Sequence, residues 1–232
     1  MPNRVDTKFV LTLEQLSLVL KDLSADYGAL EIDGVRRHRY RTLYFDTEGF
    51  ALYLDHHAGA RNGYKVRSRL YVDSDRSFLE IKKKTRPCRT LKTRTETPAM
   101  ATEIAPDAAR FIEAHSTVDS RELQPVLLNQ FERISLVSKE RRERLTLDMN
   151  LEFGQDGRDV EIPGIAVAEL KQETVDRGST FYSAMRAMRV RPTGFSKYCI
   201  GVSLLVPTVK HNRFKPKLRM LQRMTGGLRV GR

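Results

Sequence analysis

Lysine and arginine recur at every second position of residues 64–71, and this alternation limits what the chain can fold into. In this segment Lys65, Arg67 and Arg69 are separated by Val66 and Ser68. Successive side chains of a β-strand point to opposite faces of its sheet. The three cations are therefore predicted to share one face of a strand.

A second segment repeats the pattern a few residues later. Glu80, Lys82 and Lys84 share one parity, and Leu79 and Ile81 take the other. The residues between the two segments, Asp73-Ser74-Asp75, suit a hairpin turn. Two adjacent strands that both concentrate cations would make a surface suited to a polyanion.

Alternation of charged and apolar residues runs through most of the chain. For a single strand, the ordinary interpretation is an antiparallel sheet whose charges face water. Over about six strands, however, the polar faces carry Arg, Lys and isolated Glu, with few neutral polar residues. A sheet curled with this face inward would form a charged tunnel, and helices would have to cover its apolar outer face. The sequence does not decide the direction of the curl.

The element pattern predicts an α+β fold in which an eight-stranded antiparallel β-barrel is reasonable. Thr12 and Gln15 form a capping-box pattern at the start of the first helix. Strands are predicted at residues 3–11, 39–46, 63–73, 76–84, 89–96, 126–137, 141–153, 158–162 and 165–173. Helices are predicted at residues 13–24, 101–115, 178–188 and 196–205, with a short helix or irregular segment at 47–57 and a loop at 28–34.

The charge balance favours an anionic partner. The chain has 41 Lys and Arg against 29 Asp and Glu, a net charge of +12. Nucleic acid, a membrane surface and phosphate-rich small molecules all fit that balance. From Lys210 onward there are eight cations and no Asp or Glu. We therefore predict a domain over residues 1–206, followed by a basic tail over 207–232.

Cysteine content and hydropathy predict a cytoplasmic protein. The two cysteines, Cys88 and Cys199, suggest neither a disulfide framework nor a metal site. No secretory leader pattern opens the sequence, which runs directly into a strand-like pattern. No apolar run approaches the length of a membrane span.

An ordered set of short motifs resembles a known family. The motifs are Tyr44-Phe45-Asp46-Thr47, Lys65-x-Arg67-x-Arg69, Glu80-Ile81-Lys82, Lys92-x-Arg94, Arg144-Leu145-Thr146-Leu147-Asp148, Glu169-Leu170-Lys171 and Phe195-Ser196-Lys197-Tyr198. In this order they resemble the VTC domain, the polyphosphate polymerase module of the vacuolar transporter chaperone complex. That module belongs to the triphosphate tunnel metalloenzymes, together with the CYTH proteins. The resemblance implies an eight-stranded tunnel with flanking helices and charged side chains pointing inward.

The resemblance also implies roles for individual residues. Arg67, Arg69, Lys82, Arg133, Arg144 and Lys197 would be catalytic. Lys8, Lys65, Lys92, Arg94 and the hydroxyl of Ser196 would bind phosphates, and Glu169 would hold Mn²⁺ or Mg²⁺. Physical chemistry agrees, because guanidinium forks match phosphate oxygens and carboxylates suit these two ions. Asp46 is instead predicted to fix a turn or to cap the segment that follows it.

The implied reaction is transfer of the terminal phosphoryl group of ATP to phosphate or to a growing polyphosphate chain. The CYTH branch opens with Glu-x-Glu-x-Lys, whereas this chain has Arg4-Val5-Asp6-Thr7-Lys8. This difference counts against thiamine triphosphatase or adenylyl cyclase activity. Eukaryotic relatives carry an SPX domain and a membrane segment, and neither is expected here.

Three other functions remain open. One is a triphosphatase of the same fold, and another is a non-catalytic polyphosphate-binding module. A nucleic-acid-binding protein ranks last, because the chain has no Trp and few aromatics among the basic strands. Expected partners are ATP, triphosphate or polyphosphate, and the basic tail could contact a membrane protein or an anionic surface.

Overall fold

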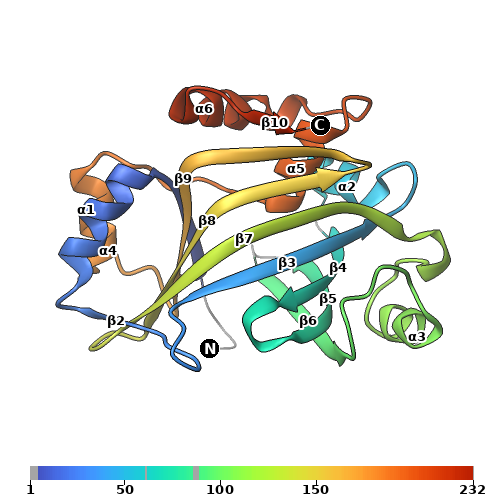
Figure 1. Ribbon diagram of the computed structural model, residues 1–232, viewed down its shortest axis with the longest axis horizontal. Coiled ribbons are helices and arrows are strands. Elements are labelled where there is room, and N and C mark those ends of the chain that lie inside the picture. Colours follow the sequence, from blue (N-terminus) through green and yellow to red (C-terminus); the bar gives the residue numbers. More distant parts are fainter. Residues whose placement is uncertain (1–4, 61, 86–88, 232) are drawn as a thin grey trace.

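A single curved antiparallel sheet with helices on both faces makes up the structure (Figure 1). The computed structural model describes residues 5–60, 62–85 and 89–231. The strands are β1 (Val5–Thr12), β2 (Tyr27–Ala29), β3 (Arg37–Asp46), β4 (Tyr64–Tyr71), β5 (Arg76–Thr85), β6 (Arg89–Thr97), β7 (Gln124–Ser138), β8 (Glu143–Gln155), β9 (Arg158–Gln172) and β10 (Arg229–Gly231). The helices are α1 (Leu13–Leu23), α2 (Ala51–Ala58), α3 (Pro106–His115), α4 (Thr180–Ala187), α5 (Lys197–Leu205) and α6 (Lys215–Thr225), with short 3₁₀ turns η1 (Val72–Ser74), η2 (Ser120–Glu122) and η3 (Asn212–Phe214).

The main strands are hydrogen-bonded in the order β1-β9-β8-β7-β3-β4-β5-β6, while β10 pairs with β9 and β2 with β7. The predicted α+β class with about eight main antiparallel strands is therefore confirmed. The predicted closed barrel is wrong in one respect. Within the part of the chain that the structure describes, β1 and β6 do not pair with each other, so the sheet is open along that seam. The backbone of Lys8 at the free edge of β1 instead accepts a hydrogen bond of 2.7 Å from the N–H of Thr193.

Local sequence signals set the ends of the helices. Thr12 and Gln15 form the predicted capping box at the start of α1. Ser179 caps α4, and Ser196 caps α5. α3 begins at Pro106 rather than at residue 101, because proline is well suited to the first turn of a helix and disfavours helical geometry in the residue before it.

A bulge divides β8 into two halves that face opposite ways. The sequence pattern predicts that Leu145, Leu147, Leu151 and Phe153 share one face. The pairing with neighbouring strands shifts between Met149 and Leu151, where Asn150 has a φ of 51°. An extra residue in one strand reverses the alternation that follows it. Consequently Leu145 and Leu147 pack on the outer, convex face of the sheet, and Leu151 and Phe153 pack on its concave face.

β9 bends in a similar way and combines two predicted strands into one. The break predicted between residues 162 and 165 is a bend at Pro163-Gly164, where Gly164 has a φ of 71°. Ladder pairing continues on both sides of the bend. Two short predicted strands therefore become one strand that follows the curvature of the sheet.

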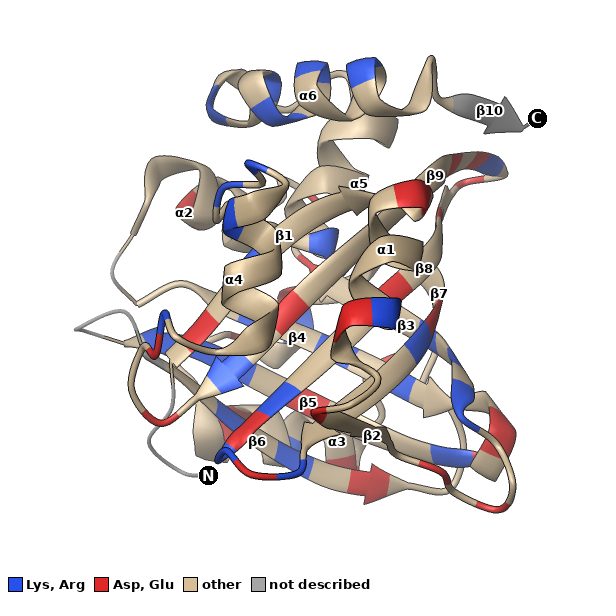
Figure 2. Ribbon diagram, turned by 90° about the vertical axis from the view of Figure 1, so that its left-hand side faces the viewer, with Lys and Arg blue, Asp and Glu red and all other residues tan. Residues whose placement is uncertain are grey.

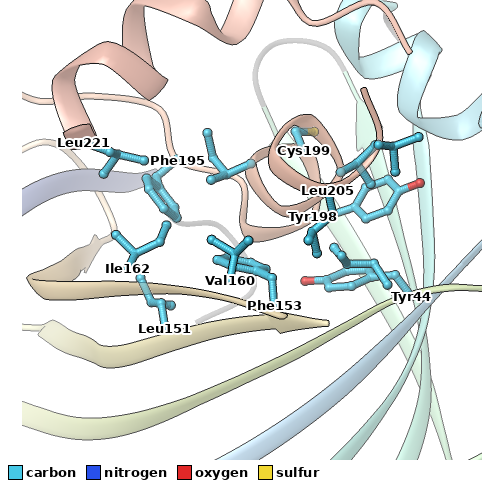
Figure 3. Close-up of a cluster of buried hydrophobic side chains, with 14 of the residues drawn as sticks. Tyr44, Leu151, Phe153, Val160, Ile162, Phe195, Tyr198, Cys199, Leu205 and Leu221 are labelled. Atoms are coloured by element: carbon cyan, nitrogen blue, oxygen red, sulfur yellow. The ribbon is translucent and has the colours of Figure 1, made fainter. Parts of the chain in front are cut away.

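The helices fall into an outer set and an inner set. α1 and α4 cover apolar residues of β1, β8 and β9 on the convex face, where Phe9 meets Phe181 edge-on at 5.4 Å. α3 covers β4 and β5, with Ile112 fully buried. α5 lies on the concave side, against Tyr44 and Phe153 (Figure 3). α6 covers it from above, and its Leu221 is fully buried (Figure 1).

Two segments predicted as loop or tail form regular structure. Residues 27–29 form β2 rather than part of a loop, because they pair with β7. Residues 207–232 include η3, α6 and β10. Pro87 and Cys88, at which the sequence predicts a strand break and an incidental thiol, lie outside the described residues. No helix in the described ranges is long and apolar enough to span a membrane.

Close packing of α5 on the sheet predicts an effect at Gly201. A methyl group there would lie 2.5 Å from Phe153 Cδ1 and 2.6 Å from Leu127 Cδ2. Gly201→Ala should therefore lower the free energy of unfolding by about 1–3 kcal/mol, despite the better helix propensity of alanine. Gly28→Ala is the matched control, because nothing lies within 4 Å of a methyl group there. Urea denaturation of both variants measures the difference, and equal stabilities would contradict this packing.

Candidate functional site

The concave face of the sheet is apolar where α5 covers it and strongly charged elsewhere. We call the charged part the basic hollow. Its cations come from β1, β4, β5, β7, β9 and the first turn of α5, and its carboxylates come from β5, β8 and β9. The cations are Lys8, Lys65, Arg67, Arg69, Lys82, Arg133, Lys171 and Lys197, and the carboxylates are Glu80, Asp148 and Glu169.

Charges on strands far apart in the sheet interact across this hollow. Lys82 on β5 feels the charge of Glu169 on β9, and Lys65 on β4 feels that of Lys8 on β1. These strands lie near opposite ends of the strand order. The sheet therefore curls with its charged face inward, which resolves the direction that the sequence left open.

Glu80 holds two cations on one wall of the hollow. Its carboxylate is fully buried and accepts hydrogen bonds of 2.8 Å from Arg67 Nε and 2.7 Å from Lys92 Nζ. Burial alone would raise the pKa of Glu80, but the charges of Arg67, Arg69 and Lys92 lower it below its ordinary value. Arg67 also donates a hydrogen bond of 3.4 Å to the hydroxyl of Tyr44.

Asp148 has the same role on the facing wall. It accepts hydrogen bonds of 2.5 and 2.7 Å from Arg133 and a further one from Lys197. Burial opposes its ionisation, yet the two cations lower the pKa of Asp148. Burial also lowers the pKa of Lys197 to about 8, in spite of this carboxylate. Lys197 is therefore close to its titration point near neutral pH.

Glu169 is the third carboxylate and the predicted metal ligand. Its Oε1 lies 3.4 Å from Lys8 Nζ, and Lys171 donates to its Oε2. Burial would raise the pKa of Glu169, but the charges of Lys8 and Lys171 lower it. Three or more metal-ligating side chains do not cluster anywhere in the described residues. A Mg²⁺ ion commonly takes one or two carboxylates and completes its shell with phosphates and water. Glu169 thus fits an ion that arrives with a phosphate chain.

Two stacked aromatic rings support the guanidinium groups at the centre of the hollow. Tyr40 on β3 and Phe131 on β7 stack with centroids 5.0 Å apart and an interplanar angle of 2°. Arg69 lies 5.5 and 5.7 Å from the two centroids, and Arg133 lies 5.2 and 5.3 Å from them. Lys197 lies 4.3 Å from the centroid of Phe131. Cation–π contacts therefore help to fix these three cations.

Positive charge in the hollow is only partly neutralised. Its eight cations face three carboxylates, which leaves five positive charges in excess. Lys65 and Lys82 make no hydrogen bond or ion pair with another residue that the structure describes. Burial lowers the pKa of Lys65, and the neighbouring charge of Arg67 together with burial lowers that of Lys82. A bound anion beside either lysine would favour its charged form and so oppose both shifts.

Water can reach the hollow. The side chains of Arg133, Lys171 and Lys197 retain 18, 13 and 13% of their exposure, although each lies among charged neighbours inside the sheet. Beneath α5 the concave face is filled by apolar side chains (Figure 3), whereas in the charged part the rings of Tyr40 and Phe131 lie between cations. The charged part of the concave face thus keeps contact with solvent at these three cations.

The remaining predicted site residues lie at its margins. Lys92 bonds Glu80 from the edge strand β6, and Arg94 packs 4.4 Å above the ring of Phe78. Arg144 is exposed and donates a hydrogen bond of 3.2 Å to Ser135. The Ser196 hydroxyl caps α5 by accepting a hydrogen bond of 3.2 Å from the N–H of Cys199. This bond occupies part of the acceptor capacity of the hydroxyl oxygen. Asp46 fixes a turn and caps the following helix, as predicted, because its carboxylate accepts the N–H of Thr47 and those of Leu52 and Tyr53 in the first turn of α2.

Sequence reasoning did not assign some members of the site. Lys171 shares the parity of Glu169, so the alternation within β9 could have identified it. Asp148 lies in a quoted motif, but its pairing with Arg133 depends on the β7–β8 register. The stacking of Tyr40 on Phe131 depends on the pairing of β3 with β7. No pattern within one strand indicates that contact.

Comparison with protein families gives one match that covers most of the chain. The model of the VTC domain matches residues 3–206. The chain belongs to the VTC domain family. The match ends directly after α5, so η3, α6 and β10 lie beyond it. A comparison with curated protein sequences finds no match.

Solved structures share the fold at low sequence identity. A Bacillus halodurans protein provisionally named adenylate cyclase has a TM-score of 0.56 at 14% identity, covering 89% of this chain and 100% of that one. HpAC1 from Hippeastrum, named for adenylyl cyclase and described as having a dominant triphosphatase activity, has a TM-score of 0.54 at 16% identity, covering 88% and 97%. A Vibrio parahaemolyticus protein, also provisionally named adenylate cyclase, has a TM-score of 0.50 at 13% identity, covering 87% and 98%. The neighbours place the chain among the CYTH-like triphosphate tunnel folds.

Removing the carboxylate of Glu80 should destabilise the protein. Glu80→Gln leaves Arg67 buried beside other cations without its counter-charge, so the free energy of unfolding should fall by about 3–5 kcal/mol. Glu31→Gln is the control, because its pair with Arg36 is exposed and should contribute at most about 1 kcal/mol. Urea denaturation at pH 7 measures both, and a Glu80→Gln variant as stable as the control would contradict the assigned role.

Proposed function

We propose that this protein is a metal-dependent enzyme that transfers phosphoryl groups on triphosphate or polyphosphate, and that it synthesises polyphosphate from ATP. The proposal rests chiefly on one observation. Lys65, Arg69 and Lys82 lie together in the basic hollow, and none has a carboxylate of its own in the described structure. Membership of the VTC domain family supports the same conclusion.

A condensed phosphate chain suits this arrangement chemically. Each phosphate unit carries negative charge, so a short chain could neutralise the excess of five positive charges. Arginine forks bind phosphate oxygens with defined geometry, and lysines add compact charges. A nucleic acid of similar charge is less suited, because the aromatic rings in the hollow already stack on each other and on cations.

The residues of the hollow would act by position and charge. Arg67, Arg133 and Lys197 are held in place by Glu80 and Asp148, so they need little reorganisation when a substrate binds. Preorganised cations stabilise the negative charge of a transferring phosphoryl group. Such a reaction requires no protein nucleophile. Lys65, Arg69 and Lys82 would bind the phosphates on either side of the bond that breaks.

Glu169 would hold the divalent ion. When bound, Mg²⁺ or Mn²⁺ would supply additional positive charge beside the phosphate oxygens. Binding would require Lys8 and Lys171 to share or release the Glu169 carboxylate, which they contact in the absence of ligand. The remaining ligands would come from the phosphate chain and water.

A triphosphatase is the second candidate. It would use the same cations and the same carboxylate, with water in place of the phosphate acceptor. The dominant triphosphatase activity described for HpAC1, which shares the fold, favours this alternative. The products distinguish the two reactions, since synthesis yields chains longer than triphosphate and hydrolysis yields orthophosphate.

An activity assay tests the proposal. Incubation with ATP and Mn²⁺ should yield ADP and polyphosphate, detected by gel analysis of chain length. Arg69→Ala should lower the rate by at least about hundredfold, because it removes a charged donor from the transferring group. Arg36→Ala, which changes an exposed arginine, should leave the rate unchanged. Orthophosphate without longer chains would favour the triphosphatase, and binding without turnover would indicate a non-catalytic module.

The titration of Lys197 predicts how ligand affinity depends on pH. The pKa of Lys197 is about 8 without ligand, and only its protonated form attracts phosphate. Tripolyphosphate affinity should therefore be constant well below pH 8 and fall up to tenfold per unit above it. Lys197→Arg should make this decline shallower, since arginine stays protonated, while the other buried lysines and the ligand's own ionisation affect both proteins alike. Calorimetric titrations between pH 6.5 and 9.5, about 1.5 units on either side of this pKa, measure the affinity of both proteins. Parallel affinity–pH profiles of the wild type and the variant would contradict the prediction.

A further inference from the structure

The net charge of the chain lies almost entirely in its last quarter. Every Asp and Glu precedes Arg177, and residues 177–232 contain 13 Lys and Arg. The preceding 176 residues have 28 cations and 29 carboxylates, a balance of −1. An excess of this kind on one stretch of chain favours an anionic ligand more strongly than net charge alone would.

Surface cations before and after Arg177 differ in their partners. Eight exposed arginines before it form ion pairs, such as Arg36 with Glu31 and Arg121 with Asp119. Among the described residues beyond it, the exposed cations of α4, α6 and their loops form no ion pair with a carboxylate. The described exposed cations of this C-terminal surface therefore lack the ion pairs that the earlier arginines form.

α6 arranges three of these cations in a line. Lys215, Arg219 and Arg223 are exposed and four residues apart, so they share one face of the helix. The opposite face is held against the core by Leu221, which is fully buried. Like charges at this spacing repel each other. The stripe is thus held on the outward face of α6, where a bound anion would relieve this repulsion.

The inner face of α6 contacts a loop at the edge of the basic hollow. Lys217 of α6 donates a hydrogen bond of 2.5 Å to Thr193 and another to the carbonyl of Gly194. The next carbonyl of that loop, on Phe195, accepts the ammonium of Lys8 at 2.9 Å. Figure 2 shows cationic positions on α6 and, below it, around the end of α4. Lys217 and Lys8 therefore bind neighbouring residues of one loop beside the hollow, and the stripe lies on the opposite face of α6 from Lys217.

We propose that the exposed face of α6 is a second binding site for long-chain polyphosphate, which it holds outside the hollow while another part of the same chain occupies the hollow. This inference rests on the proposed function. A polyphosphate is favoured over an anionic membrane because α6 packs beside the loop that contacts Lys8 of the hollow, so one long chain could reach both. The apolar face of α6 is also buried, which leaves nothing to insert into lipid. The site lies beyond residue 206, outside the matched family domain.

Binding experiments with two phosphate lengths test the second site. The test variant is Lys215→Gln/Arg219→Gln/Arg223→Gln, which leaves the buried face of α6 intact. The control is Arg36→Gln/Arg110→Gln/Arg121→Gln, which removes the same charge from exposed positions elsewhere. Affinities of the full chain for tripolyphosphate and for long-chain polyphosphate are measured by calorimetry, expressed per phosphate. Sedimentation with phosphatidylserine vesicles is measured in parallel.

The second site predicts a loss confined to one ligand. The test variant should bind long-chain polyphosphate at least about tenfold more weakly than wild type and bind tripolyphosphate equally well, since linked sites raise affinity only for a ligand that spans both. The control should bind both as wild type does. Equal losses in test and control variants, or a loss of vesicle binding alone, would overturn the second site. Failure of wild type to bind even tripolyphosphate would overturn the proposed function as well.

Discussion

The structure depends on an unequal balance of charge inside a curved sheet. Three carboxylates hold most of the eight cations in the basic hollow, yet Lys65, Arg69 and Lys82 are left without one. Unpaired buried charge is costly, as the lowered pKa values of Lys65 and Lys82 record. Partial exposure of Arg133, Lys171 and Lys197 and the rings of Tyr40 and Phe131 reduce this cost. An anionic ligand would remove it.

Two backbone irregularities make that separation of charge and packing feasible. The bulge at Asn150 and the bend at Pro163-Gly164 change which residues of β8 and β9 face inward. On one side of them the concave face carries Asp148 and Glu169, and on the other it carries Phe153 and other apolar residues. α5 covers the apolar side, and its first turn delivers Lys197 to the charged side. One curved sheet thereby forms both a charged hollow and an apolar core.

Much of this arrangement was predictable from the sequence, because alternation along a strand assigns its faces. The shared face of Lys65, Arg67 and Arg69 and the cap at Thr12 follow from local patterns. The division of the β8 apolar face at Asn150 does not follow from such patterns, because a bulge moves residues between faces without any change in composition. The open seam between β1 and β6 was also not predictable. It depends on curvature accumulated over the whole sheet, which no single strand encodes.

The most direct test of the central claim is a crystal structure of the protein with tripolyphosphate. The account predicts phosphate oxygens within hydrogen-bonding distance of Lys65, Arg69 and Lys82, with the contacts of Glu80 and Asp148 to their cations retained. A phosphate chain bound only on the exterior, with those three side chains unchanged and unoccupied, would contradict it.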